Sequence, residues 1–160
     1  MAITKDSFKQ TLSCWASGVT VITTRREGGI HGMTATSFCS LSLDPPLIMI
    51  AVDNRNRTKK QIEEQRAFGV MILSADQEEV SNCAAGFKGE EGNYLIDLPS
   101  HKEVTGAPIL DRSLAWMDCS LHASYDGGDH TIFVGKVEAT GGSDGEPLLW
   151  FSRGYRWFNK

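Results

Sequence analysis

Apolar and polar positions along the chain predict a protein built mostly from β-strands. Residues 19–25 are rich in β-branched side chains, and residues 31–37 return to extended structure after turn formers at 27–29, so the pair is expected to form a hairpin. Residues 47–52 are apolar at every position, which predicts a strand covered on both faces. Four further strands are expected at residues 68–73, 114–125, 131–140 and 148–151.

A short amphipathic helix is predicted near the N-terminus. Thr4 or Asp6 can cap its start, and Gly18 stands where such a helix would stop. Its apolar face is formed by residues at helical spacing, namely Phe8, Leu12 and Trp15.

Two more helices are expected between the strands. One runs from a cap at Thr58 to about Gln65, and the other opens at Ser74 or Asp76 and continues through Ala85.

Residues 87–108 are expected to form a long irregular loop, because they are rich in Gly, Glu and Pro with isolated apolar positions. Loops of that length in a compact domain are usually functional or mobile. Residues 141–147, GGSDGEP, are expected to form a turn.

The order of these elements predicts the fold class. Six or more strands, mostly in antiparallel hairpin order, with two or three short helices, indicate a mainly β fold with some α, a closed or nearly closed barrel and not a doubly wound sheet. A chain of 160 residues with 41% hydrophobic residues suits one domain over residues 1–160. The sequence contains neither a P-loop nor the glycine-rich dinucleotide fingerprint, so a nucleotide cofactor would have to be held in another way.

Charge and targeting signals limit the possible partners and cellular location of the protein. The formal charge of −4 comes from 16 basic and 20 acidic residues without long blocks of one sign, which argues against nucleic acid or an anionic membrane as a partner. The N-terminus lacks the pattern of a secretion signal, and no apolar run reaches the length of a membrane span, so we expect a cytoplasmic protein.

The cysteines and histidines do not suggest a metal site. Cys14, Cys39, Cys83 and Cys119 form no C-x-x-C pair and are expected to be buried free thiols, with Cys39 packed as a small apolar residue. The remaining histidines share no metal-like spacing with them, namely His31, His101 and His122.

One stretch combines extended structure with many small hydroxyls: HGMTATSFCSLSLDPPL, residues 31–47. Strand amides with Thr and Ser hydroxyls can bind the edges of a flat heteroaromatic ring without blocking its approach. The loop DNRNRTKK, residues 53–60, then offers a helix N-terminus with cations, which suits a phosphate. A ring at one strand and a phosphate at the next helix start suit flavin mononucleotide.

Several segments together resemble the flavin reductase family with the FMN-binding split-barrel fold. They keep the family's order from about Phe8 to Phe158, and they are GVTVITT (18–24), GMTATSFCSLSLDPPL (32–47), GDH (128–130) with VGKV (134–137), PLLWF (147–151) and GYRWF (154–158).

The resemblance implies a homodimeric barrel that binds FMN or FAD and reduces it with NADH or NADPH. It places the isoalloxazine and ribityl at Thr34, Ala35, Thr36 and Ser37, with Ser40, Leu41 and Ser42 along the same edge. The resemblance also implies that the flavin phosphate is bound by Asn54, Asn56, Arg57 and Thr58, and Arg55 or Lys59 could take the place of one of them. Phe87 matches a position near the exposed side of the ring, and Tyr155 and Arg156 match positions near the bound cofactors.

His130 matches the family histidine that lies near the nicotinamide. Hydride transfer from a nicotinamide to a flavin needs no protein nucleophile, because the cofactors carry the chemistry. His130 is therefore expected to position the nicotinamide more than to act as an essential acid. Trp116, Trp150 and Trp157 are most simply core or dimer-contact aromatics.

Three functions remain open at this point. The first is an NAD(P)H-dependent flavin reductase of the EC 1.5.1 type that supplies reduced flavin to a partner monooxygenase. The second is an FMN-binding electron carrier that does not use NAD(P)H directly, and the third is a binding protein without turnover. The presence of Gly128, Asp129 and His130 favours the first.

Overall fold

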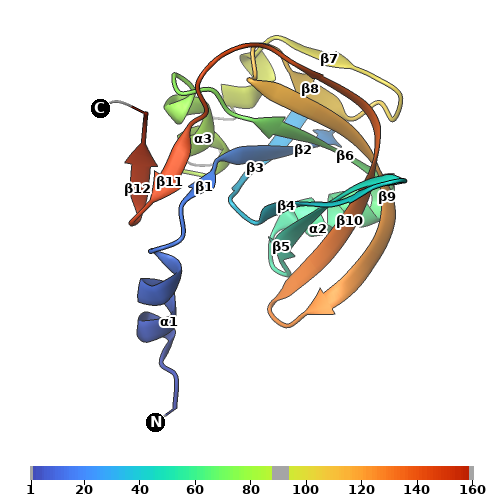
Figure 1. The fold of residues 1–160 in the computed structure, drawn as a ribbon. Helices are drawn as coiled ribbons and strands as arrows, with labels where there is room; N and C mark the ends of the chain where they lie inside the picture. The colour runs from blue at the N-terminus through green and yellow to red at the C-terminus, as the bar shows by residue number, and fades with distance from the viewer. Residues whose placement is uncertain (1, 88–93, 159–160) are drawn as a thin grey trace.

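A seven-stranded antiparallel sheet curls into the barrel that forms the body of the molecule (Figure 1). The structure is a computed structural model, and it describes residues 2–87 and 94–158. The strand order is β3-β2-β6-β9-β10-β5-β4. These strands are β2 (Thr20–Arg26), β3 (Gly29–Ala35), β4 (Phe38–Leu43), β5 (Pro46–Asp53), β6 (Ala67–Ile72), β9 (Ala115–Gly127) and β10 (His130–Gly142). The expected mainly β fold, with a barrel of antiparallel hairpins, is confirmed.

Hairpins build most of this sheet. The predicted pairing of β2 with β3 is confirmed, and it runs in register from Thr20 opposite Ala35 to Arg26 opposite Gly29. The longest hairpin joins β9 to β10 through a turn at Gly128, whose φ of +82° is a conformation that favours glycine. Irregular pairing after Val134 bends β10, so the hairpin can follow the curve of the barrel.

Two hydrophobic clusters cover opposite faces of the sheet. The first fills the barrel interior and includes Ile22, Ile50, Phe68 and Phe133. The second lies outside β2 and β6, under a layer of short elements, and includes Val21, Met71 and Leu148.

This layering corrects the expectation for residues 47–52. In β5 only alternate residues are buried, namely Ile48, Ile50 and Val52, while Leu47, Met49 and Ala51 are partly exposed. Strands β2 and β6 are instead buried on both faces over most of their length, because the second cluster packs on their outer side. An apolar run therefore predicted a strand correctly but not which strand the outer layer would cover.

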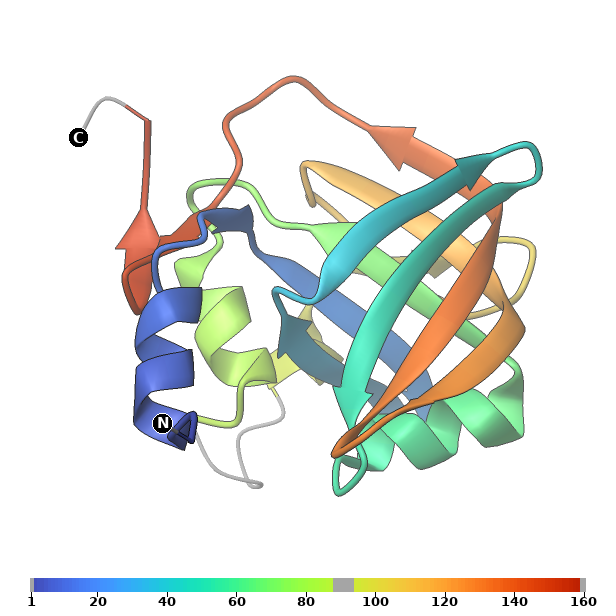
Figure 2. The ribbon, with the colours of Figure 1, turned by 60° about the horizontal axis from the view of Figure 1, so that its bottom comes forward.

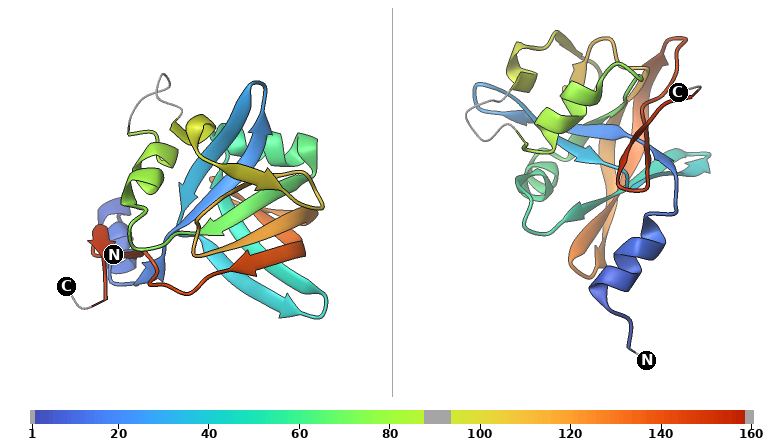
Figure 3. Two further views of the ribbon diagram at one scale, coloured as in Figure 1. Left: turned by 90° about the horizontal axis from the view of Figure 1, so that it is seen from above. Right: turned by 90° about the vertical axis from the view of Figure 1, so that its left-hand side faces the viewer.

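The first helix is shorter than expected and stands apart from the barrel. Thr4 caps α1 (Lys5–Leu12) in a reciprocal capping box with Ser7, and the helix ends well before Gly18. In Figure 1 and in the right view of Figure 3, α1 projects from the body. Phe8 and Leu12 of the helix are exposed, and so is Trp15, which lies beyond its end.

The other two helices differ from the predictions at their starts. Asn56, not Thr58, caps α2 (Arg57–Gln65), because its side chain accepts a hydrogen bond from the backbone of Thr58. Helix α3 (Glu78–Ala84) begins later than expected. The Ser74 hydroxyl donates to Asp76 at 2.5 Å, so these two side chains form a turn before the helix instead of a cap.

Short elements surround the barrel. Within the loop predicted at 87–108, of which residues 88–93 lie outside the described chain, the structure has a 3-10 helix η1 (Tyr94–Asp97) and a hairpin of β7 (Ser100–Lys102) with β8 (Pro108–Leu110). A second sheet joins β1 (Ser17–Gly18), β11 (Leu149–Phe151) and β12 (Gly154–Arg156). Neither β1 nor β12 was predicted, because strands of two or three residues carry no periodicity.

The four cysteines are free thiols, but their expected burial was largely wrong. Cys14 and Cys39 are exposed, Cys83 is partly buried, and Cys119 alone is fully buried. Burial raises the pKa of the Cys119 thiol to about 12. No helix in the described part of the chain is both long and apolar enough to cross a membrane.

Candidate functional site

A hollow of about 380 Å³ lies where β3 leaves the sheet. In Figure 2, α3 lies on one side of the β3–β4 junction, and β5 with the β9–β10 turn lies on the other. Most of the lining side chains are small, and they come from segments far apart in the sequence: Met33, Thr34, Ala35, Thr36, Ser37, Ala51, Asp53, Asn56, Ala84, Ala85 and His130.

The hydroxyl side chains at the β3–β4 junction, residues 34–37, differ in their hydrogen bonding. Thr34 Oγ1 donates to the Ser81 carbonyl oxygen at 2.5 Å, and Ser37 Oγ donates to the Ala51 carbonyl oxygen at 2.8 Å. Thr36 is exposed, and its side chain makes no hydrogen bond to another described residue. Two hydroxyls thus hold the walls together, and the Thr36 hydroxyl is left open to solvent.

Beside β5, the hollow is lined by Asp53, whose carboxylate is paired with Arg55. Arg55 Nη2 lies 2.7 Å from Asp53 Oδ2, and both Arg55 Nε and its backbone N–H donate to Asp53 Oδ1. These hydrogen bonds hold the pKa of Asp53 well below its usual range, so the carboxylate stays ionised at any working pH.

Asn54 fastens this loop to the β9–β10 turn. Its Nδ2 donates to the Gly128 carbonyl oxygen at 3.0 Å, and its Oδ1 accepts from Thr131 Oγ1 at 2.7 Å. Its backbone N–H donates to the Asp129 carbonyl oxygen at 3.0 Å. The histidine between Asp129 and Thr131 is therefore held on both sides.

His130 presents its imidazole to the hollow, half exposed to solvent. Its Nδ1 lies 2.7 Å from Asp129 Oδ1. A carboxylate only accepts, so Nδ1 carries a proton, and Nε2 of the neutral ring keeps its lone pair.

The start of α2 is supported by buried polar contacts. Thr58 is fully buried, and its hydroxyl donates to Asn56 Oδ1 at 2.8 Å while lying 2.8 Å from His31 Nε2. Burial, and after it the nearby charges of Arg26 and Arg57, lower the pKa of His31. The neutral ring of His31 then donates from Nε2 to Thr58, which keeps its hydroxyl engaged inside the protein.

The structure brings six of the sequence-predicted residues together in the hollow: Thr34, Ala35, Thr36, Ser37, Asn56 and His130. Asn54, Arg57 and Thr58 flank it at the start of α2. Ser40, Leu41 and Ser42 lie further along β4, at the edge of the sheet.

The remaining predicted residues lie outside the lining. Phe87 is 79% exposed, and exposed Arg156 donates to the carbonyl oxygen of Tyr155. The Tyr155 hydroxyl contacts Ser81 and Asn82 of α3.

Five lining residues were not predicted from the sequence: Met33, Ala51, Asp53, Ala84 and Ala85. Asp53 could have been found, because it ends β5 directly before the asparagine-rich loop. Ala84 and Ala85 carry no chemical signal and reach the hollow only because α3 packs on β3.

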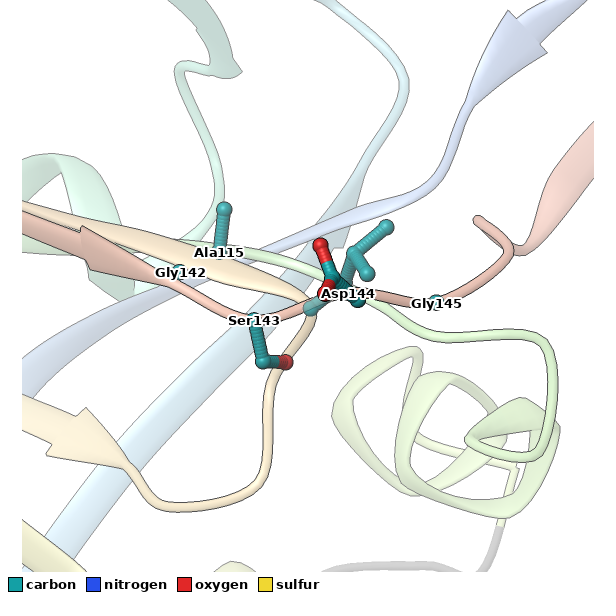
Figure 4. Close-up of a pocket in the computed structure, with 6 residues that line it drawn as sticks. Ala115, Gly142, Ser143, Asp144 and Gly145 are labelled. Atoms are coloured by element: carbon teal, nitrogen blue, oxygen red, sulfur yellow. The ribbon is translucent and has the colours of Figure 1, made fainter.

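A second, wide-open hollow of about 540 Å³ lies at the other end of the β9–β10 hairpin (Figure 4). Its lining combines Leu114 and Ala115 with residues 142–145, and it contains none of the sequence-predicted residues. Within residues 2–87 and 94–158, no group of three or more His, Cys, Asp or Glu side chains is arranged to hold a metal ion.

Comparisons with known proteins agree with this geometry. A family model described as flavin reductase like domain matches residues 12–159. The reductase component of 4-hydroxyphenylacetate 3-monooxygenase from Thermus thermophilus is 45% identical over 153 residues, covering 95% of each chain. An NADH-dependent flavin reductase from Rhodococcus is 37% identical over 157 residues, covering 96% of this chain and 86% of the relative. The solved structure of flavin reductase PheA2 superposes with a TM-score of 0.89 at 33% identity, covering 99% of this chain and 100% of the other.

Proposed function

Because the chain belongs to the family described as flavin reductase like domain, we propose that it reduces a flavin, FMN or FAD, with NADH or NADPH. The observation that carries the proposal is the hollow, which unites the hydroxyl-rich junction, the asparagine-rich loop and His130. NADH is the expected donor, since relatives over nearly the whole chain are named as NADH-dependent.

The residues of the hollow fit a flavin. Alanines and short hydroxyl side chains leave room for a flat ring, and exposed Thr36 with the peptide groups of the junction can bond its polar edges. A phosphate would meet the exposed side chain of Arg57 at the start of the nine-residue helix α2, where the helix dipole also favours an anion. We therefore assign the ring to the β3–β4 junction and the phosphate to the start of α2.

His130 is proposed to hold the nicotinamide carboxamide. Its imidazole lies in the lining of the hollow and is oriented by Asp129, so Nε2 can accept from the carboxamide amide. The bound flavin would supply the hydride acceptor. The protein's contribution is to hold both rings in contact and to restrict water around them.

Further details belong to the same proposal. A reductase of the EC 1.5.1 type would pass reduced flavin to a partner monooxygenase, and two of the relatives are named as the reductase component or subunit of a monooxygenase. Four free cysteines suit the reducing cytoplasm, where pyridine nucleotides are also available.

A homodimer is proposed as the working form. An eight-residue helix has little stability by itself, and α1 exposes Phe8 and Leu12 while burying none of its residues; Trp15, just after it, is also exposed. A second copy of the chain that covers this face would remove apolar surface from water.

The deciding experiment is anaerobic mixing of the purified protein with excess FMN and NADH while the visible absorbance of the flavin is followed. Bleaching that scales with protein and passes one equivalent is expected, because reduced flavin leaves as product. If only a chemical reductant bleaches bound flavin, and NADH and NADPH are both inert, the protein is an electron carrier or a binding protein and the proposal is wrong.

A further inference from the structure

Tyr155 lies outside the hollow, yet its hydroxyl is bonded to the helix that forms one wall of it. The hydroxyl oxygen is 2.8 Å from Asn82 Oδ1 and 2.9 Å from Ser81 Oγ. A phenol has one proton and an amide oxygen only accepts, so Tyr155 donates to Asn82 and the Ser81 hydroxyl donates to Tyr155. The ring is held edge-on against Trp150, with centroids 5.1 Å apart.

Ser81 connects this contact to the hollow. It is fully buried in α3, and its carbonyl oxygen accepts the hydrogen bond from Thr34. Three and four residues further on, Ala84 and Ala85 line the hollow. One residue of α3 is thus bonded from β3 by Thr34 and from β12 by Tyr155.

Helix α3 depends on such contacts for its position. It has only seven residues, and Gln77 at its start makes no side-chain cap. A helix of about two turns has little stability without tertiary contacts. Helix α3 lies in contact with β3 at Gly32, where an added Cβ would lie 3.7 Å, an ordinary contact distance, from Ala84 Cβ. A small shift of α3 would therefore move the Ala84–Ala85 wall relative to Thr34.

We infer that Tyr155 is a positioning residue, whose hydroxyl acts through Ser81 and Asn82 to place the Ala84–Ala85 wall and so sets the affinity for flavin without touching it. The inference rests on the proposed function of the hollow as a flavin site. It assigns to the C-terminal hairpin β11–β12 control over a wall made by residues about seventy positions earlier.

Tyr155→Phe tests the inference, because it removes the hydroxyl and keeps the ring against Trp150. The Kd for FMN, measured by quenching of flavin fluorescence, is expected to rise about three- to tenfold, the effect of one lost hydrogen bond. The kcat at saturating FMN and the KM for NADH should stay within about twofold, since contacts to bound cofactors are unchanged. Asn82→Ala should raise the Kd for FMN by a similar factor. The Kd of the double variant should not exceed the higher of the two single-variant values, because both substitutions break the same bond.

Thr140→Val is the matched control, since it removes a hydroxyl that donates to the Trp116 carbonyl oxygen near the far end of β10. Its Kd for FMN should equal that of the wild type, with all measurements made well below the unfolding temperature of each variant. An unchanged Kd in Tyr155→Phe overturns the inference, and so does an equal loss in the KM for NADH, which would mean direct contact with the cofactors. A wild-type protein that binds neither FMN nor FAD would instead overturn the proposed function itself, and the inference with it.

Discussion

His130 pairs in register with Asp53 at the end of β5, whereas Arg57 stands four residues further on, at the start of α2. The imidazole is oriented by Asp129, and the guanidinium is exposed beside the first turn of the helix. Since these two groups meet different parts of the space around the hollow, they are expected to serve different cofactors.

Crossed substitutions test this division. His130→Ala is expected to lower kcat/KM for NADH about tenfold while changing the Kd for FMN little, because one hydrogen bond to the nicotinamide is lost. Arg57→Ala is expected to raise the Kd for FMN about tenfold or more, since a charge-assisted bond to phosphate is lost, and to leave the KM for NADH nearly unchanged.

His122→Ala and Lys60→Ala are the matched controls, one on β9 and the other on the exposed side of α2. Both should resemble the wild type in steady-state kinetics and in FMN titrations. Equal losses for NADH and FMN in both test variants would contradict the division of roles.

At the scale of elements, β6 contributes to both hydrophobic clusters, with Phe68 and Val70 in the first and Met71 in the second. It is buried on both faces, and the β7–β8 hairpin crosses it at Gly69. A Cβ at Gly69 would lie 2.8 Å from the Pro108 carbonyl oxygen and 2.5 Å from Thr23 Oγ1, which itself donates to that carbonyl. Backbone and a bonded hydroxyl cannot both move aside, so glycine is required there.

Gly69→Ala is expected to lower the free energy of unfolding by about 1–3 kcal/mol, the usual cost of overpacking a core. The measurement is urea unfolding followed by tryptophan fluorescence. Gly18→Ala is the control, because an added Cβ there meets nothing within 4 Å, and its effect should stay within about 0.5 kcal/mol. Equal stabilities of the two variants would show that β8 does not press on β6 as described.

At the scale of the whole molecule, α1 is attached to the body by few contacts. Just after it, the Ser13 carbonyl oxygen accepts from the backbone of Ser152, and the apolar face of the helix is left open to solvent. Such a face is expected to be covered by a second copy of the chain.

Sedimentation equilibrium at micromolar concentration should therefore give twice the chain mass of 17.6 kDa. The double variant Phe8→Glu with Leu12→Glu is expected to sediment as a monomer, because two charges cannot be buried at the interface without partners. Val104→Glu, a charge placed on an exposed residue of the β7–β8 hairpin, should remain dimeric. A wild-type monomer would contradict the dimer.

Much of the fold and part of the site followed from local patterns. The β-branched run of β2, the turn residues after it and the return to extended structure in β3 predicted a hairpin, and small hydroxyls ending in a double proline marked the junction that lines the hollow. These features could be read because strand periodicity, turn chemistry and capping depend on neighbours within a few residues.

Only the tertiary structure decided which surfaces meet. The burial of β6 on both faces, the exposure of Cys39 and the arrival of Ala84 at the hollow all depend on packing between segments far apart in the chain. The same holds for Tyr155, whose hydroxyl reaches α3 across more than seventy residues. The sequence alone therefore determined the elements and the chemistry they carry, while burial and mutual distance were decided by the fold, because both are properties of pairs of segments and not of any one of them.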